Sequence, residues 1–139
     1  MTVLRYEPWA LRLFNTPSTT TADSGGRRTG AWLPASDIHE EAVQYLIHID
    51  LPGVDPASVE ITSEQGVLTV RGKRELQRPE NPEGYRRVER LSGEFQRRFS
   101  LPETADAQNI RARYVNGVLE IAIPKLAQVQ PRKISVEAA

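Results

Sequence analysis

Hydrophobic and polar residues alternate on both sides of a two-residue turn near the C-terminal end of the chain. The turn is Asn116-Gly117, a pair that tolerates positive φ, and such a pair between alternating runs is the strongest short-range indication of a β-hairpin. Pro124 ends the second run. The positions expected on one face of this hairpin are Ile110, Ala112, Tyr114, Leu119, Ile121 and Ile123.

The same alternation predicts further strands upstream. Residues 35–39 and 43–51 are two of them, and residues 59–61 and 67–71 flank a Gln65-Gly66 turn, which predicts a second hairpin. Two hairpins with similar second strands suit a sandwich of two antiparallel sheets, so we expect an all-β fold. The face expected to be buried in the longest run carries Val43, Tyr45, Ile47, Ile49 and Leu51.

Residues 93–102 predict one more strand, in which a charged residue shares a face with apolar residues. Arg97 lies on the face of Phe95, Phe99 and Leu101. Two interpretations are open. In one, the arginine stem packs against its neighbours while the head reaches water. In the other, the guanidinium is partly buried and needs a charged partner, because an unpaired buried charge is costly.

A long charged segment, residues 72–92, separates the two halves of the predicted fold. Loops of this length inside a compact domain are usually functional or disordered. Within it, residues 85–91 could form a short polar strand that lacks a buried face of its own. Such a strand is a candidate for pairing at a sheet edge or on a partner subunit.

The first 31 residues differ in composition from the rest. An apolar cluster of Trp9, Leu11, Leu13 and Phe14 precedes residues 15–30, whose Thr, Ser and Gly content is typical of a linker. The cluster either docks permanently on its own domain or acts as a mobile adhesive arm. The residues alone leave both interpretations open.

The last residues contain one short motif. Ile134 and Val136 are two positions apart and would project to one side of an extended strand. The motif is either a final core strand or a peptide that adds to a sheet edge, with its two side chains entering pockets.

Composition and charge exclude several classes of function. The 139 residues are 39% hydrophobic, which indicates one domain with a modest core plus appendages, and the absence of cysteine excludes disulfides and thiol catalysis. No apolar run is long enough to span a bilayer, and the start lacks a signal-peptide pattern, so we expect a cytoplasmic protein. Residues 37–64 carry seven acids and no Lys or Arg, whereas residues 71–98 carry nine basic residues and five acids. The interleaved acids argue against nucleic-acid binding and favour contacts between complementary segments of one chain or of two subunits.

Motifs for catalysis or metal binding are weak. Residues 66–74 resemble a phosphate-binding loop, but the spacing is one residue too long and Arg74 replaces the required Ser or Thr. His48 and Asp50 share a polar strand face with no nucleophile motif nearby, and they are interpreted as a surface pair. His39 and His48 have no metal-ligand spacing. We therefore expect neither an enzyme nor a metal site.

Six motifs, in the right order, resemble those of the small heat-shock protein (α-crystallin) family. The A-x-x-x-N-G-V-L pattern around the hairpin is long and fairly specific. The tail motif ends in Val where many members have Ile, a mild departure. The matching segments are residues 32–38 (WLPASDI), 51–54 (LPGV), 66–72 (GVLTVRG), 95–102 (FQRRFSLP), 112–119 and 134–136 (ISV).

The resemblance implies an immunoglobulin-like β-sandwich, the α-crystallin domain, over residues 32–126. Residues 1–31 would be a flexible N-terminal arm and residues 127–139 a short C-terminal extension. The function implied is ATP-independent holding of unfolding client proteins by a dynamic oligomer of dimers, without a cofactor. The long loop is similar to the bacterial and plant form, in which a loop strand pairs with the first strand of the partner subunit.

The resemblance and the residue pattern together assign expected sites. Client proteins would contact the arm at Trp9, Leu11, Leu13 and Phe14. Ile134 and Val136 would insert into a groove of a neighbouring subunit. That groove would be lined by Val59, Ile61, Ile110 and Ala112. The dimer interface would contain Tyr85, Arg86, Arg87, Val88 and Arg97.

Two alternatives belong to other classes. One is a co-chaperone adaptor similar to the CS domains, which lack both a hydrophobic arm and an I-x-I/V tail. The other is a small hydrolase using His48 and Asp50. Large assemblies in light scattering favour the heat-shock interpretation, whereas a monomer favours the adaptor.

Overall fold

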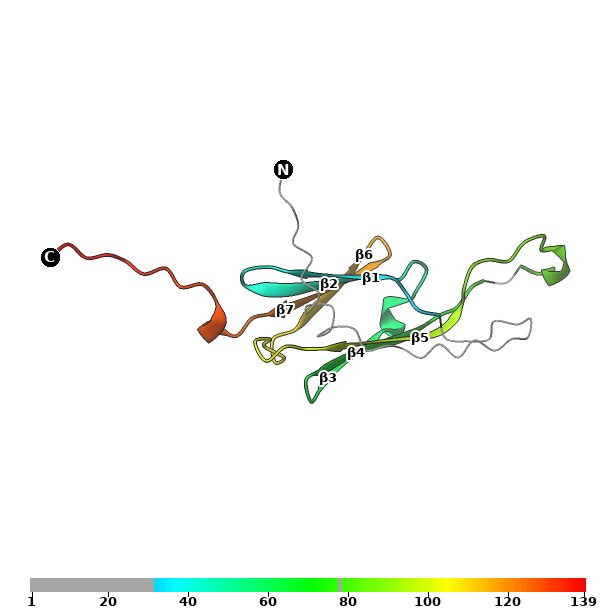
Figure 1. Ribbon diagram of the computed structural model, residues 1–139. Helices are drawn as coiled ribbons and strands as arrows, with labels where there is room; N and C mark the ends of the chain where they lie inside the picture. Colours follow the sequence, from blue (N-terminus) through cyan, green and yellow to red (C-terminus); the bar gives the residue numbers. More distant parts are fainter. Residues whose placement is uncertain (1–31, 78) are drawn as a thin grey trace.

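Two antiparallel sheets face each other across one layer of apolar side chains (Figure 1). The computed structural model describes residues 32–77 and 79–139. One sheet has the order β1 (Ser36–Glu40), β2 (Gln44–Asp50), β7 (Val118–Pro124), β6 (Arg111–Val115). The other has the order β3 (Glu60–Glu64), β4 (Val67–Arg74), β5 (Gly93–Ser100). The expected all-β sandwich is confirmed.

Each sheet contains one of the two predicted hairpins. In the β3–β4 turn, Gln65 and Gly66 have φ of 51° and 74°, and in the β6–β7 turn Asn116 and Gly117 have φ of 52° and 78°. Two consecutive residues with positive φ give a turn whose twist matches that of the flanking strands. A Cβ on Gly117 would also lie 3.3 Å from Pro52 Cα, so this turn packs closely on the chain after β2.

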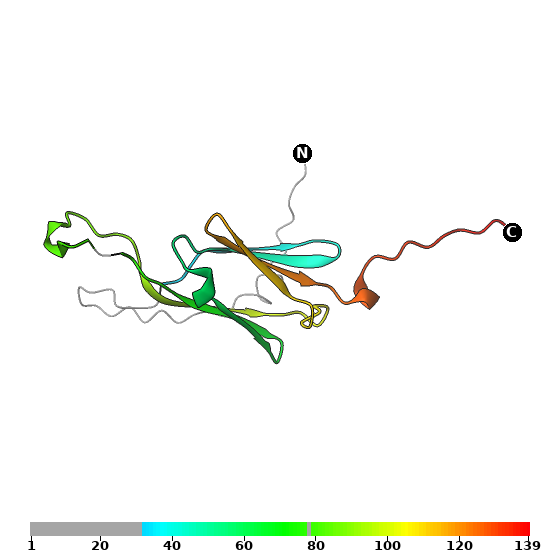
Figure 2. The same ribbon diagram turned by 180° about the vertical axis from the view of Figure 1, so that it is seen from behind.

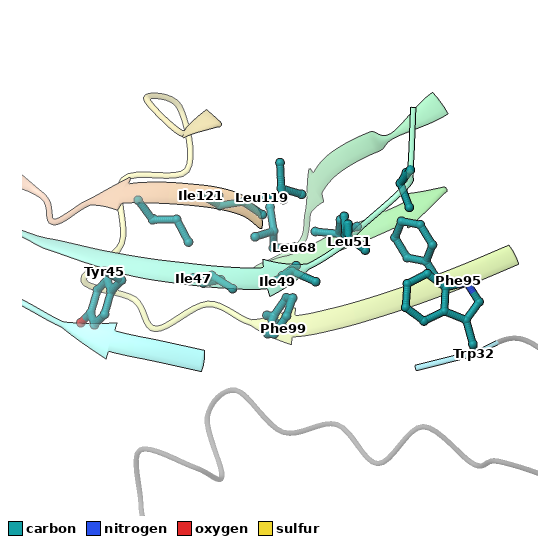
Figure 3. Packing of buried hydrophobic residues seen from close by; sticks show 13 residues of the cluster. Trp32, Tyr45, Ile47, Ile49, Leu51, Leu68, Phe95, Phe99, Leu119 and Ile121 are labelled. Atoms are coloured by element: carbon teal, nitrogen blue, oxygen red, sulfur yellow. The ribbon is translucent and has the colours of Figure 1, made fainter. Parts of the chain in front are cut away.

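The core comes from the inner faces of β2 and β7 in one sheet and of β4 and β5 in the other. Figure 3 shows Trp32 and Phe95 at one end of this layer and Tyr45 at the other. The Trp32 and Phe95 rings meet edge to face, with centroids 5.4 Å apart. The buried apolar side chains are Trp32, Tyr45, Ile47, Ile49, Leu51, Val54, Leu68, Val70, Phe95, Phe99, Leu119, Ile121 and Ile123.

Val43 is an exception to the predicted buried face. It precedes β2 and is 47% exposed. The pairing of β2 with β7 begins at Gln44 opposite Pro124, and only the Val43 carbonyl still accepts a hydrogen bond, from the Lys125 N–H. Because the ladder and the core both end here, the alternation continues in the sequence without a surface to cover Val43.

The three-residue 3₁₀ turns η1 (Pro56–Ser58), η2 (Pro82–Gly84) and η3 (Ala127–Val129) lie between or beyond the strands. The segment with η2 projects beyond one end of the sandwich, and the tail after η3 leaves from the opposite end (Figures 1 and 2). Both protruding segments therefore lie outside the core that holds the two sheets together.

β4 is longer than the sequence pattern predicted, because it continues past Arg71 to Arg74. Gly72 pairs with Phe95 across the ladder. A Cβ on Gly72 would lie 2.8 Å from Phe95 Cζ and 3.3 Å from the Ser58 carbonyl oxygen. Gly72 therefore leaves the space in which the Phe95 ring lies across the neighbouring backbone.

We expect Gly72→Ala to lower the free energy of unfolding by about 1–3 kcal/mol, because the methyl group would overpack a closed part of the core. Chemical denaturation monitored by circular dichroism measures the change. Gly84→Ala is the matched control, since the nearest atom to its Cβ would lie 3.9 Å away. Equal stability of the two variants would contradict this account of Gly72.

Candidate functional site

Arg97 joins the edges of the two sheets. It lies on the inner face of β5, opposite Val70, and its guanidinium carbon is 5.5 Å from the Phe99 ring centroid. Nη2 donates a hydrogen bond to Ser36 Oγ in β1, with a donor–acceptor distance of 2.8 Å. Removal from water lowers the pKa of Arg97 below its ordinary value.

The ion pair expected for Arg97 is not formed within the described part of the chain. The salt bridges among residues 32–77 and 79–139 do not include this residue, and its one bonded partner is a neutral hydroxyl. The side chain is half-buried, so its head is neither free in water nor fully enclosed. Pairing with an acid of another subunit stays a prediction.

Arg74 is the only buried charged residue in the described structure, with 8% of its surface exposed. Its guanidinium carbon is 4.0 Å from the Trp32 ring centroid, a cation–π contact. Nε donates to the Leu91 carbonyl at 2.9 Å and Nη1 to the Pro52 carbonyl at 3.3 Å, while Nη2 also donates to Leu91. Burial and then the nearby Arg90 lower the pKa of Arg74.

These contacts fix both ends of the long loop. Arg74 ends β4, where the loop begins, and it holds Leu91, where the loop returns. Trp32 Nε1 donates to the Gly93 carbonyl at 3.0 Å, two residues further on. A buried cation that satisfies backbone carbonyls thus holds the base of residues 75–92 against the end of the core.

Sequence reasoning missed Arg74 because it ended this strand at Arg71. Every second residue of β4 lies on the inner face, so the series Leu68 and Val70 continues with Gly72 and Arg74. The two-residue period of this strand could have indicated the burial of Arg74. It was missed because glycine and arginine are not hydrophobic and so do not continue the apolar pattern.

Residues 85–91 form no strand in the described chain, and every one of them is exposed. The exposed apolar side chains are Tyr85, Val88 and Leu91. Arg87 Nε lies 3.6 Å from Glu89 Oε1, but both side chains are largely in solvent, so this contact contributes little to stability. The segment therefore has the exposure expected of a strand that pairs outside its own chain.

The four residues expected to form the tail-binding groove lie on the outer strands of the two sheets. Val59 and Ile61 are half-buried at β3, Ile110 is half-buried just before β6, and Ala112 on β6 is exposed. Because Arg97 places β5 beside β1, the opposite edges β3 and β6 share the other side of the sandwich. That these four residues line one groove stays a prediction.

The tail carries its two apolar side chains in solvent. Ile134 is 80% exposed and Val136 is 95% exposed, and residues 131–139 contain no strand or helix. The interpretation of this motif as a final core strand is therefore wrong. Neither side chain belongs to the cluster of buried apolar residues that forms the core.

His48 is engaged in a hydrogen-bonded cluster with Glu120 and Arg113 rather than placed beside a nucleophile. Its Nε2 is 3.0 Å from Glu120 Oε2, while Arg113 Nε is 2.7 Å from Glu120 Oε1. The hydrogen bonds from Arg113 and then from His48 lower the pKa of Glu120. Asp50, the expected neighbour of His48, is exposed.

Within residues 32–77 and 79–139, no group of three or more His, Cys, Asp or Glu could hold a metal ion. No helix of this part of the chain is long and apolar enough to cross a membrane. A shallow cavity of about 560 Å³ lies at the loop base, between the end of β4 and Tyr85, Val88 and Arg90. The arm residues Trp9, Leu11, Leu13 and Phe14 lie outside the described residues.

Comparison with known proteins places this architecture in a family. Spore protein SP21 of Stigmatella aurantiaca is 40% identical over 109 residues, which cover 78% of this chain and 64% of that protein. The 16.9 kDa class I heat shock protein 1 of Triticum aestivum is 36% identical over 132 residues, covering 93% and 87%. A small heat-shock protein from Xylella fastidiosa, described as having a distinct high order structure, superposes with a TM-score of 0.67 and 43% identity over 78% of this chain and all of that one.

The two-sheet sandwich with its long loop and extended tail is an α-crystallin domain with appended segments. The profile of the Hsp20/alpha crystallin family matches residues 37–137, and the chain belongs to that family. The chain matches slightly less than two thirds of the length of the Stigmatella relative.

We expect Arg74→Met to loosen the loop base. The substitution keeps an unbranched side chain against Trp32 but leaves the part-buried Leu91 carbonyl without its charged donor, at a cost of about 1–3 kcal/mol in stability. Hydrogen exchange measured by mass spectrometry should show faster exchange over residues 88–93. Arg71→Met is the matched control, because Arg71 is exposed and pairs with Glu60 on the outer face. Unchanged exchange at the loop base in Arg74→Met would contradict this role.

Proposed function

We propose that the protein is an ATP-independent chaperone that holds unfolding proteins, working as a dynamic oligomer built from dimers. The observation that carries the proposal is the solvent exposure of Ile134 and Val136 on a tail outside a complete core. Family membership supports the same conclusion. The chain would act in the cytoplasm without a cofactor, its partners being unfolding clients and copies of itself.

Its three parts would divide the work. Residues 1–31 are proposed as the client-binding arm, residues 32–126 as the α-crystallin domain and residues 127–139 as the linking extension. A holdase needs apolar surface that is covered until a client appears. Association of subunits would cover this surface, and dissociation would expose it, so no nucleotide hydrolysis is required.

Dimers would form by exchange of residues 85–91 between subunits. No strand of residues 32–77 or 79–139 pairs with the outer edge of β1, which would offer its backbone groups to such a strand. Tyr85, Arg86, Arg87 and Val88 would lie in this interface. Arg97 would lie near it, because its bonded partner Ser36 belongs to β1.

Replacing residues 85–91 with a short Gly/Ser turn should give a folded monomer, because the paired strand would be lost. Sedimentation at micromolar concentration measures the mass, and circular dichroism checks the fold. The control replaces residues 79–84 with Gly and Ser at equal length, which leaves the exchanged strand intact. A shortened variant that stays dimeric would count decisively against exchange.

Larger assemblies would form when Ile134 and Val136 enter the groove at β3 and β6. Burying two such side chains gives roughly 3–6 kcal/mol before the cost of ordering the tail. The remaining contact is weak, but many such links in one assembly hold firmly because each further link is intramolecular. Single links can still open, as a reservoir that responds to heat requires.

Ile134→Ala combined with Val136→Ala should reduce the assembly to dimers or small oligomers while the sandwich stays folded. Light scattering gives the mass and circular dichroism the fold. Ser135→Ala is the control, because in an extended strand this side chain projects away from the two apolar ones. Full-size assemblies of a folded double mutant would mean that the tail is not a linker.

Deleting residues 1–31 should leave a soluble domain that hardly suppresses the aggregation of a heated client. A full-length variant with Trp9, Leu11, Leu13 and Phe14 changed to Ser should behave in the same way, because it removes only the apolar cluster. Thr19, Thr20 and Thr21 changed to Ala is the control for the linker. Turbidity of the client measures protection, and undiminished protection by the Ser variant would rule out this cluster as the main client surface.

A further inference from the structure

A row of ionisable side chains crosses the outer face of the sheet that contains β1. The strand register pairs Asp37 of β1 with His48 of β2, His48 with Glu120 of β7, and Glu120 with Arg113 of β6. The His48–Glu120 and Glu120–Arg113 contacts are 3.0 and 2.7 Å long. From β6 to β1 the row thus reads guanidinium, carboxylate, imidazole, carboxylate.

The row ends on an unpaired acid at the edge of the sheet. Asp37 is exposed, and among the described residues β1 has a neighbouring strand on one side only. Among the described residues, no Lys, Arg or His nitrogen lies within 4 Å of the Asp37 carboxylate, and no hydrogen bond reaches it. A strand added beside β1 would place a side chain directly opposite Asp37, close enough to interact. A cation there would give Asp37 the partner that it lacks among the described residues.

Residues 85–91 carry the cations that such a strand needs. Arg86, Arg87 and Arg90 are all exposed, and the segment contains only one acid, Glu89. The segment projects beyond the end of the sandwich in Figure 1. The segment also contains an apolar residue, Val88, whose surface is 70% exposed in the single chain.

We propose that an arginine of residues 85–91 from a second copy of this chain pairs with Asp37 and extends the charge row across the subunit boundary. This rests on the strand exchange proposed above and makes Asp37 the residue that selects the exchanged strand. The pair also restricts register, because a slip by one residue turns the arginine to the opposite face of the sheet. A carboxylate opposite Asp37 would repel it instead.

Two full-length variants with opposite charge changes test the pairing. One is Asp37→Arg, and the other combines Arg86→Glu, Arg87→Glu and Arg90→Glu. Each variant alone puts like charges at both junctions of its homodimer, whereas the mixed dimer has opposite charges at both. Native mass spectrometry should show heterodimers about tenfold above their statistical share at low salt, since each junction changes from repulsion to attraction. The excess should shrink as salt is added.

Asp50→Arg is the matched control, because Asp50 is an exposed acid on the same outer face but lies on the interior strand β2. Mixed with the triple variant, it should give no excess of heterodimers. The proposal is overturned if the mixture of Asp37→Arg with the triple variant shows no excess of heterodimers. It is also overturned if the mixture of Asp50→Arg with the triple variant shows an equal excess. Should Asp37→Arg fail to fold, Asp37→Asn removes only the charge, and an unchanged dimer affinity and salt dependence would overturn the proposal.

The experiment separates this inference from the exchange on which it rests. If the variant lacking residues 85–91 is monomeric but the charge variants show no pairing preference, exchange stands and the role of Asp37 falls. If that shortened variant stays dimeric, exchange itself falls. Because the chain has no cysteine, disulfide cross-linking can also measure the register of the exchanged strand. Asp37→Cys is mixed in turn with Arg86→Cys, Arg87→Cys and Arg90→Cys, and one of the three mixtures should give a disulfide-linked dimer.

Discussion

Each of the two open sheets leaves two edge strands, and these edges are where the domain can pair with another segment of chain. The edge strands of the four-stranded sheet are β1 and β6, and those of the three-stranded sheet are β3 and β5. Unpaired backbone groups at an edge invite another strand, so natural sheets protect their edges or use them. Here the charges on β1 and the half-buried aliphatic side chains on β3 give each edge a different chemistry. Different edges can therefore accept different segments of a neighbouring chain.

Two arginines on the inner face connect the core to those edges. Arg97 bonds Ser36 and so holds β5 beside β1, while Arg74 bonds Leu91 and holds the loop base. Arg74 is buried and Arg97 is half-buried, and each guanidinium packs against an aromatic ring. A guanidinium suits this task because its five N–H donors can satisfy several acceptors while its flat face packs on an aromatic surface. The segments that would assemble are thus anchored to the rigid layer.

The core itself is independent of the protruding segments. Its buried side chains come from four strands, from Trp32 shortly before β1, and from the connection after β2. Neither residues 85–91 nor residues 131–139 contribute to it. This separation would let the tail and loop dock and release, as proposed, without unfolding the sandwich, since the free energy of their docking would not be part of the free energy of folding.

The sequence by itself determined the strands and turns, because period-2 alternation and positive-φ pairs such as Asn116-Gly117 are local properties of the chain. It also placed Arg97 correctly among apolar neighbours. Only the tertiary structure decided that Val43 lies beyond the end of the ladder, that Arg74 is buried over Trp32, and that Ser36 is the partner of Arg97. These outcomes depend on where sheets stop and which strands face each other, and such contacts join residues far apart in the sequence, as Arg97 and Ser36 are at 61 positions.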